Sequence, residues 1–126
     1  MLSSHKLPKY LKVAIKVALA NDSYPRKRHG AVLVRGGSIQ TVGWNSLKSE
    51  RSRHAEIHAL QAADTQQLTG ATLYVARVGM DNSPRLSAPC DACRAAIRAA
   101  QIKQVVYTLN GSDYGVWKVL DSLYSH

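Results

Sequence analysis

Cysteine and long apolar runs are scarce in this chain of 126 residues, and each scarcity excludes a class of protein. Cysteine occurs only twice, at Cys90 and Cys93, which excludes both a framework of disulfides and a closed zinc site with four cysteines. No apolar run is long enough to span a bilayer, and segment 1–6 lacks the apolar stretch of a secretory signal. We therefore expect no membrane partner and a location in the cytoplasm, where thiols stay reduced and available to a metal ion.

Acidic residues are scarce as well, with 8 Asp and Glu against 17 Lys and Arg, which gives a formal net charge of +9. This balance favours a polyanionic partner, either a nucleotide phosphate or a strand of nucleic acid, although a merely solubilising surface is the alternative. The basic segments Arg26–Arg28 and Lys48–Arg53 are the candidates for phosphate contact. The length and the absence of repeats or linkers predict a single domain over residues 1–126.

Two short stretches carry the residues suited to chemistry: His54-Ala55-Glu56 and Pro89-Cys90-Asp91-Ala92-Cys93. The two cysteines are one helical turn apart and can hold one metal ion, for which His54 is the best third ligand. Two thiolates and one imidazole leave the fourth tetrahedral position to water, which is typical of a catalytic zinc rather than a structural one. Glu56 is close enough in sequence to His54 to exchange protons with that water without being a ligand.

Two other interpretations use the same residues. A Cys-x-x-Cys pair can be a redox site of the thioredoxin type, but this leaves His54 and Glu56 without a role. The run from His54 to His58 also resembles a zinc protease helix, in which the glutamate directly follows the first histidine. Here Ala55 intervenes and turns the carboxylate away, so we expect His58 to be a packing or surface residue.

Hydrophobic periodicity predicts an alternation of helices and strands. Residues 7–21 form an amphipathic helix with Lys9, Lys12 and Lys16 on a solvated face, and 31–34 and 39–44 form an antiparallel hairpin. A central strand at 71–78 and a strand at 105–109 are joined by a helix at 90–100, a crossover that makes the two strands parallel. The remaining expectations are a polar loop at 46–53, a helix at 54–64, a loop at 66–70, a long connection at 79–88, and at 114–124 either an edge strand or a last helical turn.

The combination of His-x-Glu with Pro-Cys-x-x-Cys is the signature of zinc-dependent deaminases of nucleobases. Over roughly residues 7–110 the chain resembles the cytidine deaminase-like superfamily, and Gly43-Trp44-Asn45 and Ala71-Thr72-Leu73-Tyr74-Val75 are similar to both its deoxycytidylate and its tRNA adenosine deaminase branches. The resemblance implies a three-layer α-β-α fold of the α/β class. Its mixed sheet would have about four to five strands, with an N-terminal antiparallel hairpin and parallel later strands.

The resemblance also implies a chemistry. His54, Cys90 and Cys93 would bind one Zn²⁺, and hydroxide formed on the zinc would attack the ring carbon that carries the exocyclic amine. Glu56 would shuttle protons to the ring and to the departing ammonia.

Substrate contacts are expected from residues around these motifs. The family implies that Asn45 touches the nucleoside and that the backbone of Ala55 holds the base. The further candidates are Trp44, which can stack on a base, Arg28, which can face a phosphate, and Ser87 and Pro89 beside the cysteines.

We expect a hydrolytic deaminase of a cytosine nucleoside or nucleotide, such as deoxycytidine monophosphate. The alternative is a deaminase of cytosine or adenine in single-stranded DNA or RNA, and a non-catalytic scaffold is disfavoured by the presence of Glu56. The chain departs from the tRNA branch at Ser87-Ala88, where that branch usually has a glutamate before Pro-Cys, and it lacks the extra upstream ligands of many deoxycytidylate deaminases. The resemblance also implies a homo-oligomer, either a dimer or a tetramer.

Overall fold

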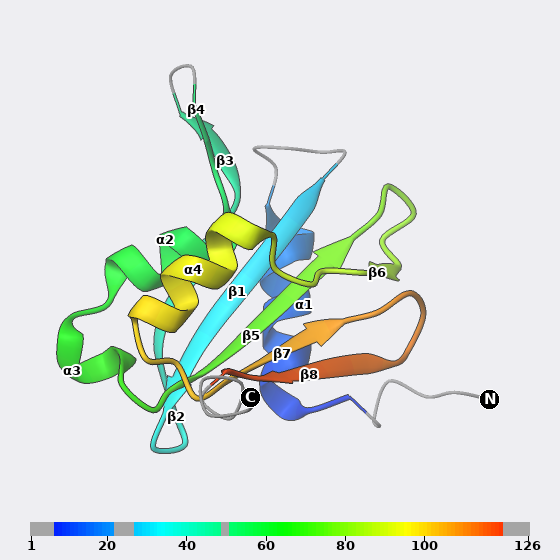
Figure 1. Ribbon diagram of the computed structural model, residues 1–126. Coiled ribbons are helices and arrows are strands. Elements are labelled where there is room, and N and C mark those ends of the chain that lie inside the picture. Colours follow the sequence, from blue (N-terminus) through cyan, green and yellow to red (C-terminus); the bar gives the residue numbers. More distant parts are fainter. Residues whose placement is uncertain (1–6, 22–26, 49–50, 120–126) are drawn as a thin grey trace.

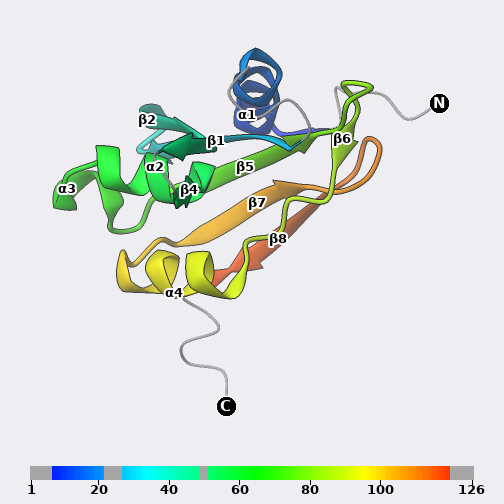
Figure 2. The ribbon, with the colours of Figure 1, turned by 90° about the horizontal axis from the view of Figure 1, so that it is seen from above.

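A mixed sheet forms the middle layer of the molecule. The computed structural model describes residues 7–21, 27–48 and 51–119. The strands follow the order β2-β1-β5-β7-β8, with the short β6 paired to β5. Their bounds are β1 Arg28–Arg35, β2 Ser38–Trp44, β5 Thr72–Val78, β6 Pro84–Arg85, β7 Gln104–Thr108 and β8 Tyr114–Lys118. Helix α1 (Lys9–Ala20) covers one face, and α2 (Ala55–Ala62) and α4 (Asp91–Ala99) cover the other (Figures 1 and 2). The predicted layered α/β fold is confirmed.

Alternating side chains of the central strands separate the core into two parts. In β1, Ala31 and Leu33 pack with α2 and α4, whereas Val32 and Val34 pack with α1. All four are nearly inaccessible to solvent, as is expected of a strand covered on both faces. The apolar run that predicted a central strand at 71–78 corresponds to β5, which lies between β1 and β7.

The strand directions agree with the sequence in most places. Strands β1 and β2 form the expected antiparallel hairpin, and β5 pairs parallel with β7 through the α4 crossover. The sheet has six strands rather than four or five, and β8 runs antiparallel to β7, so only one of the later pairs is parallel. The short turn at 109–113 accounts for this, because a turn of that length can join only antiparallel neighbours. Of the two alternatives for 114–124, the edge strand is present as β8, and residues 120–124 lie outside the described residues.

Three connections contain more regular structure than predicted. Strands β3 (Ser46–Lys48) and β4 (Arg51–Arg53) form an antiparallel pair, have no other strand partner in the part of the chain that the structure describes, and project beyond the sheet (Figure 1). The loop at 66–70 contains most of the one-turn helix α3 (Thr65–Leu68), held by a capping box between Asp64 and Gln67. The connection at 79–88 contains β6. Each element is too short to show a hydrophobic period, which is why its polar sequence predicts a loop.

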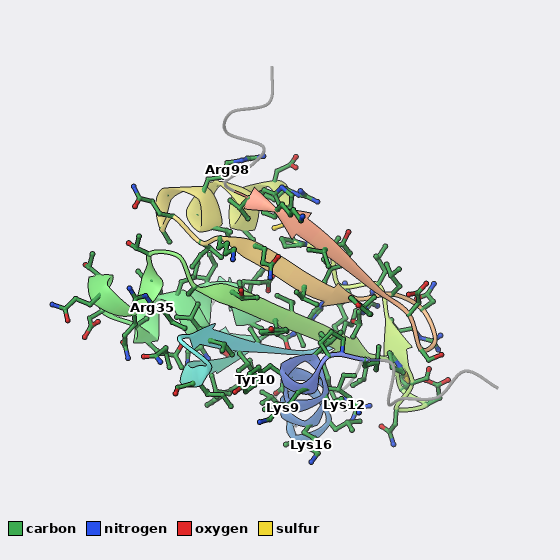
Figure 3. The ribbon with its side chains drawn as sticks, turned by 90° about the horizontal axis from the view of Figure 1, so that it is seen from below. Lys9, Tyr10, Lys12, Lys16, Arg35 and Arg98 are labelled. Atoms are coloured by element: carbon green, nitrogen blue, oxygen red, sulfur yellow. The ribbon has the colours of Figure 1, made fainter. Side chains whose placement is uncertain are left out.

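The predicted lysine row lies on α1, on the outer side of the helix (Figure 3). Lys9 and Lys16 are exposed, and Lys12 is half-buried. Because α1 covers the face of the sheet opposite to α2 and α4, these three cations contribute to the net charge from a surface remote from those helices. Among the described residues, no helix is both long and apolar enough to cross a membrane.

A glycine in β2 allows α2 to lie unusually close to the sheet. A Cβ atom on Gly43 would collide with the carbonyl oxygen of Ala55 and would lie 2.5 Å from the amide nitrogen of Ala59. Both contacts are with backbone atoms of α2, which cannot rotate away as the end of a side chain can. Gly43 therefore sets the distance between β2 and the first turn of α2.

Replacing this glycine should destabilise the protein. We expect Gly43→Ala to lower the free energy of unfolding by about 1–3 kcal/mol, because the added methyl group forces α2 away from β2. Urea denaturation followed by circular dichroism measures the change. The control is Ser38→Ala at the exposed start of the same strand, which should stay within about 0.5 kcal/mol of the parent. An unchanged midpoint for Gly43→Ala would contradict the close packing.

Candidate active site

The starts of two helices bring the predicted metal ligands together. His54 is the N-cap residue of α2 and Cys90 is the N-cap residue of α4, and both helices lie on the same face of the sheet. The Nδ1 atom of His54 lies 3.2 Å from the Sγ atom of Cys93 and 3.7 Å from the Sγ atom of Cys90. The three ligand atoms all lie within 4.8 Å of one another, although the chain separates the histidine from the cysteines by more than 30 residues.

This geometry fits one tetrahedral zinc ion. The usual Zn–N and Zn–S bond lengths place nitrogen and sulfur ligands about 3.6 Å apart in a tetrahedral site, close to the two distances seen here. Among the described residues, this is the group of histidine, cysteine and acidic side chains that could hold a metal ion. The set contains three protein ligands, so one position stays open, as in catalytic zinc sites.

The thiol of Cys93 needs a cation to become a good ligand. Burial raises the pKa of Cys93, and the nearby negative charge of Glu56 raises it further. A divalent ion reverses this effect, since a coordinating thiol loses its proton outright.

Glu56 lies in the first turn of α2 with only 5% of its surface exposed. Burial raises the pKa of this carboxyl above its usual value, against smaller opposite effects of its backbone hydrogen bond, of His54 and of Cys93. A carboxyl group whose pKa is shifted towards neutrality can both accept and return a proton at cellular pH.

Ser87 holds the connection that carries Cys90 against the sheet. The pairing of β5 with β7 ends at Val75 and Tyr107. The connection that contains Ser87 lies between the two strands beyond this last pair. The Ser87 hydroxyl donates to the Val75 carbonyl oxygen (2.9 Å) and accepts from the Thr108 amide (2.9 Å), while the Ser87 amide donates to the Thr108 carbonyl oxygen (3.0 Å). These bonds fix the chain three residues before Cys90.

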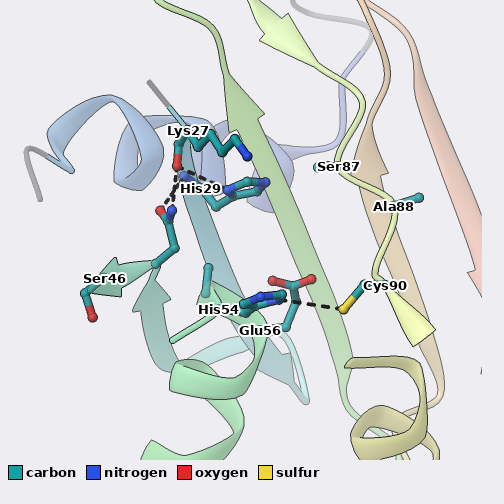
Figure 4. A pocket seen from close by; sticks show the side chains of 10 residues that line it. Lys27, His29, Ser46, His54, Glu56, Ser87, Ala88 and Cys90 are labelled. Carbon is teal, nitrogen blue, oxygen red and sulfur yellow. Dashed lines mark hydrogen bonds between the residues drawn. The ribbon is translucent and has the colours of Figure 1, made fainter. Parts of the chain in front are cut away.

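A cavity of about 280 Å³ opens beside the metal-binding cluster (Figure 4). Its lining contains Glu56, His54 and Cys90 together with three of the expected substrate contacts, Asn45, Ala55 and Ser87. Four further residues line it that sequence reasoning did not select: Lys27, His29, Ser46 and Ala88. The sequence contains a signal for two of them: Lys27 lies in the basic segment Arg26–Arg28, and Ala88 directly precedes Pro89-Cys90.

Three of the expected substrate contacts do not line this cavity. Trp44 is partly exposed and packs edge-on against His58, with ring centroids 4.4 Å apart, which agrees with a packing role for that histidine. The guanidinium of Arg28 donates to the Gly79 carbonyl oxygen (2.7 Å) and to the Asn82 side chain (2.6 Å). Pro89 is buried, and its carbonyl oxygen accepts from Arg94.

The side chain of Asn45 is engaged mainly with the protein itself. Its Oδ1 atom accepts from the side chain of Asn21 (2.7 Å) and from the His29 amide (2.8 Å), and its Nδ2 atom donates to the Lys27 carbonyl oxygen (2.5 Å). Both lone pairs of the oxygen are therefore used, and one N–H remains for a substrate. Asn45 thus also positions Lys27 and His29.

Comparison with known proteins agrees with the site. Residues 4–109 match the family described as the cytidine and deoxycytidylate deaminase zinc-binding region. The chain is 30% identical to a tRNA-specific adenosine deaminase of Buchnera aphidicola over 118 residues, which cover 89% of this chain and 72% of that protein.

Solved structures show the same fold. Cytidine deaminase from Burkholderia pseudomallei matches with a TM-score of 0.65 and 28% identity over 94% of each chain. RibD from Acinetobacter baumannii matches with a TM-score of 0.58 and 28% identity, but the match covers 78% of this chain and only 26% of that longer one. Because the family match covers most of the chain and includes both halves of the motif, the chain belongs to the cytidine and deoxycytidylate deaminase family, with a zinc-binding region.

Proposed function

We propose that this protein is a zinc-dependent hydrolytic deaminase of a cytosine nucleoside or nucleotide. His54, Cys90 and Cys93 hold the zinc, and Glu56 moves the protons. The observation that carries the proposal is the presence of a buried carboxyl group, with a raised pKa, in the same cavity as two of the three metal-binding side chains. A scaffold protein would have no chemical need for that carboxyl group.

When bound, zinc acts as a Lewis acid that lowers the pKa of a water molecule towards neutrality. Glu56 receives a proton from the water as its oxygen adds to C4 of the cytosine ring, and passes that proton to ring N3. A further proton transfer through Glu56 reaches the exocyclic amine, which leaves as ammonia while the carbonyl of the uracil product forms. The backbone of Ala55, which lines the cavity beside Glu56, holds the edge of the base.

The cavity supports a small substrate. Its volume of about 280 Å³ is at the lower end of the range for small-molecule sites, and it suits a base with its sugar. Lys27 lines the cavity and is exposed, so its ammonium group suits a 5′-phosphate. The match to a cytidine deaminase over 94% of each chain supports the same class.

A second candidate is deamination of a base in single-stranded RNA or DNA. Its support is the similarity to a tRNA-specific adenosine deaminase and the position of the β3–β4 hairpin, which begins at Ser46 in the cavity wall. The sequence of this hairpin contains Lys48, Arg51 and Arg53. If these cations contact phosphates of a bound strand, binding should weaken steeply with salt, since phosphate contacts release counterions.

A panel of substrates tests the proposal. We expect the zinc-loaded protein to release ammonia from cytidine, deoxycytidine or their monophosphates, detected by mass spectrometry of the product. Glu56→Gln keeps the shape of the side chain but cannot shuttle a proton, so its turnover should fall by at least about 10²-fold with unchanged zinc content. Undiminished turnover in Glu56→Gln would refute the proton role.

The same panel separates the two candidates. It includes adenosine, deoxyadenosine and single-stranded oligonucleotides, each at low and high salt. Turnover of oligonucleotides alone, with strong dependence on salt, would replace the first proposal by the second. Absence of turnover with every compound would remove both.

Metal analysis tests the ligand set. Cys93→Ser removes a buried thiolate, so we expect the zinc content measured by elemental analysis to fall from one per chain to well below half. The matched control is Asp91→Asn, an exposed residue in the first turn of the same helix, which should keep its zinc. Equal zinc content in Cys93→Ser and the parent protein would remove Cys93 from the ligand set.

A further inference from the structure

A histidine on the wall of the cavity has no role in the chemistry described above. His29 lies in β1 directly before Gly30, is half-buried, and lines the cavity together with Lys27. Figure 4 shows His29 and Lys27 on one side of the cavity and His54, Glu56 and Cys90 on the other. A substrate whose amine reaches Glu56 therefore presents a different part of itself to His29.

The protein fixes which nitrogen of this ring carries a proton. The Nδ1 atom of His29 lies 3.3 Å from the carbonyl oxygen of Lys27. A carbonyl oxygen only accepts hydrogen bonds, so Nδ1 must carry the hydrogen, and in the neutral ring Nε2 is then an acceptor. The same carbonyl accepts from Asn45, and Asn45 also accepts from the His29 amide, so the backbone around the ring is held as well.

The ring is neutral under physiological conditions. Burial lowers the pKa of His29 to about 4, and the charges of Arg77, His54 and Lys27 act in the same direction, against the hydrogen bond to Lys27, which raises it. Among the described residues, no group donates to Nε2. The ring therefore brings one unused acceptor to the cavity.

The side chains of Ser87 and Asn45, which the sequence suggested as substrate contacts, are less able to accept a hydrogen bond from a ligand. The Ser87 hydroxyl donates to Val75 and accepts from the Thr108 amide, and both lone pairs of the Asn45 oxygen are occupied. Lys27 can only donate. The Ser46 hydroxyl also lines the cavity and can either donate or accept, whereas the free nitrogen of the His29 ring can only accept a hydrogen from a ligand.

We propose that His29 determines substrate specificity by accepting, at Nε2, a hydrogen bond from a sugar hydroxyl of the nucleoside. This rests on the proposed function, which directs the amine of the base to Glu56 and leaves the sugar for the far side of the cavity. Phosphate oxygens and the O2 atom of cytosine are acceptors and would meet the lone pair of Nε2 unfavourably. The sugar hydroxyls are the donors in that part of a nucleoside.

The proposal is tested by comparing the binding of two ligands, with and without a 3′-hydroxyl, to two proteins, with and without His29. Dissociation constants of deoxycytidine and 2′,3′-dideoxycytidine are measured by calorimetry on the zinc-loaded Glu56→Gln protein, which binds without turnover. With His29 present, loss of the 3′-hydroxyl should weaken binding about five- to tenfold, as expected for one neutral hydrogen bond. With His29→Phe added, the two ligands should bind within about twofold of each other.

A rescue variant separates recognition from folding. His29→Gln retains an acceptor oxygen on a flexible chain and should restore part of the preference for the 3′-hydroxyl, with zinc content and circular dichroism unchanged. An equal preference in the histidine and phenylalanine proteins would overturn the role of His29 while leaving the proposed function intact. Failure of both ligands to bind the histidine protein would instead count against the proposed substrate class, and with it the inference.

A measurement without any ligand tests the basis of the proposal. Nitrogen-15 spectra of the histidine rings at neutral pH, assigned by comparison with His29→Gln, should show a neutral His29 with its hydrogen on Nδ1. A charged ring, or a ring with its hydrogen on Nε2, would overturn the inference whatever the substrate is.

Discussion

The convergence of three ligand atoms from two helix starts is the constraint on which the rest of the structure depends. His54 and Cys90 are the N-cap residues of α2 and α4, and their side chains meet because both helices pack on one face of the sheet. The parallel pairing of β5 with β7 places α4 there, since its crossover must return across that face. Gly43 brings α2 close to β2, and Ser87 fixes the approach to Cys90. Together these features hold the Nδ1 atom of His54 at 3.2 Å from the Sγ atom of Cys93 and at 3.7 Å from the Sγ atom of Cys90.

Electrostatics explains why this geometry is suited to one ion and to proton transfer. Burial raises the pKa values of both Glu56 and Cys93, and their negative charges oppose each other. A divalent cation beside them favours the thiolate, and the carboxyl group is not among the metal-binding atoms. On the other side of the cavity, burial instead lowers the pKa of His29 to about 4 and so favours its uncharged form, beside the exposed Lys27.

The sequence predicted the fold and the grouping of His54, Cys90 and Cys93 well, because both leave strong local signals. A continuous apolar run indicated β5, and the spacing of Cys90 and Cys93 indicated a helix start with two ligands. The short pieces β3, β4, β6 and α3 were missed, since elements of two to four residues show no period. The cavity wall was predicted only in part. His29 follows the basic segment Arg26–Arg28 and belongs to no motif. Its lowered pKa arises mainly from burial, which only the folded chain produces.

X-ray absorption at the zinc edge of the metal-loaded protein tests the central claim most directly, because it reports the atoms bound to the ion without relying on activity. The account predicts two sulfur neighbours at about 2.3 Å, one nitrogen at about 2.0–2.1 Å and one further light atom, which together make four ligands. A shell with one sulfur, or with nitrogen and oxygen alone, would contradict the assignment of His54, Cys90 and Cys93 to a single zinc site.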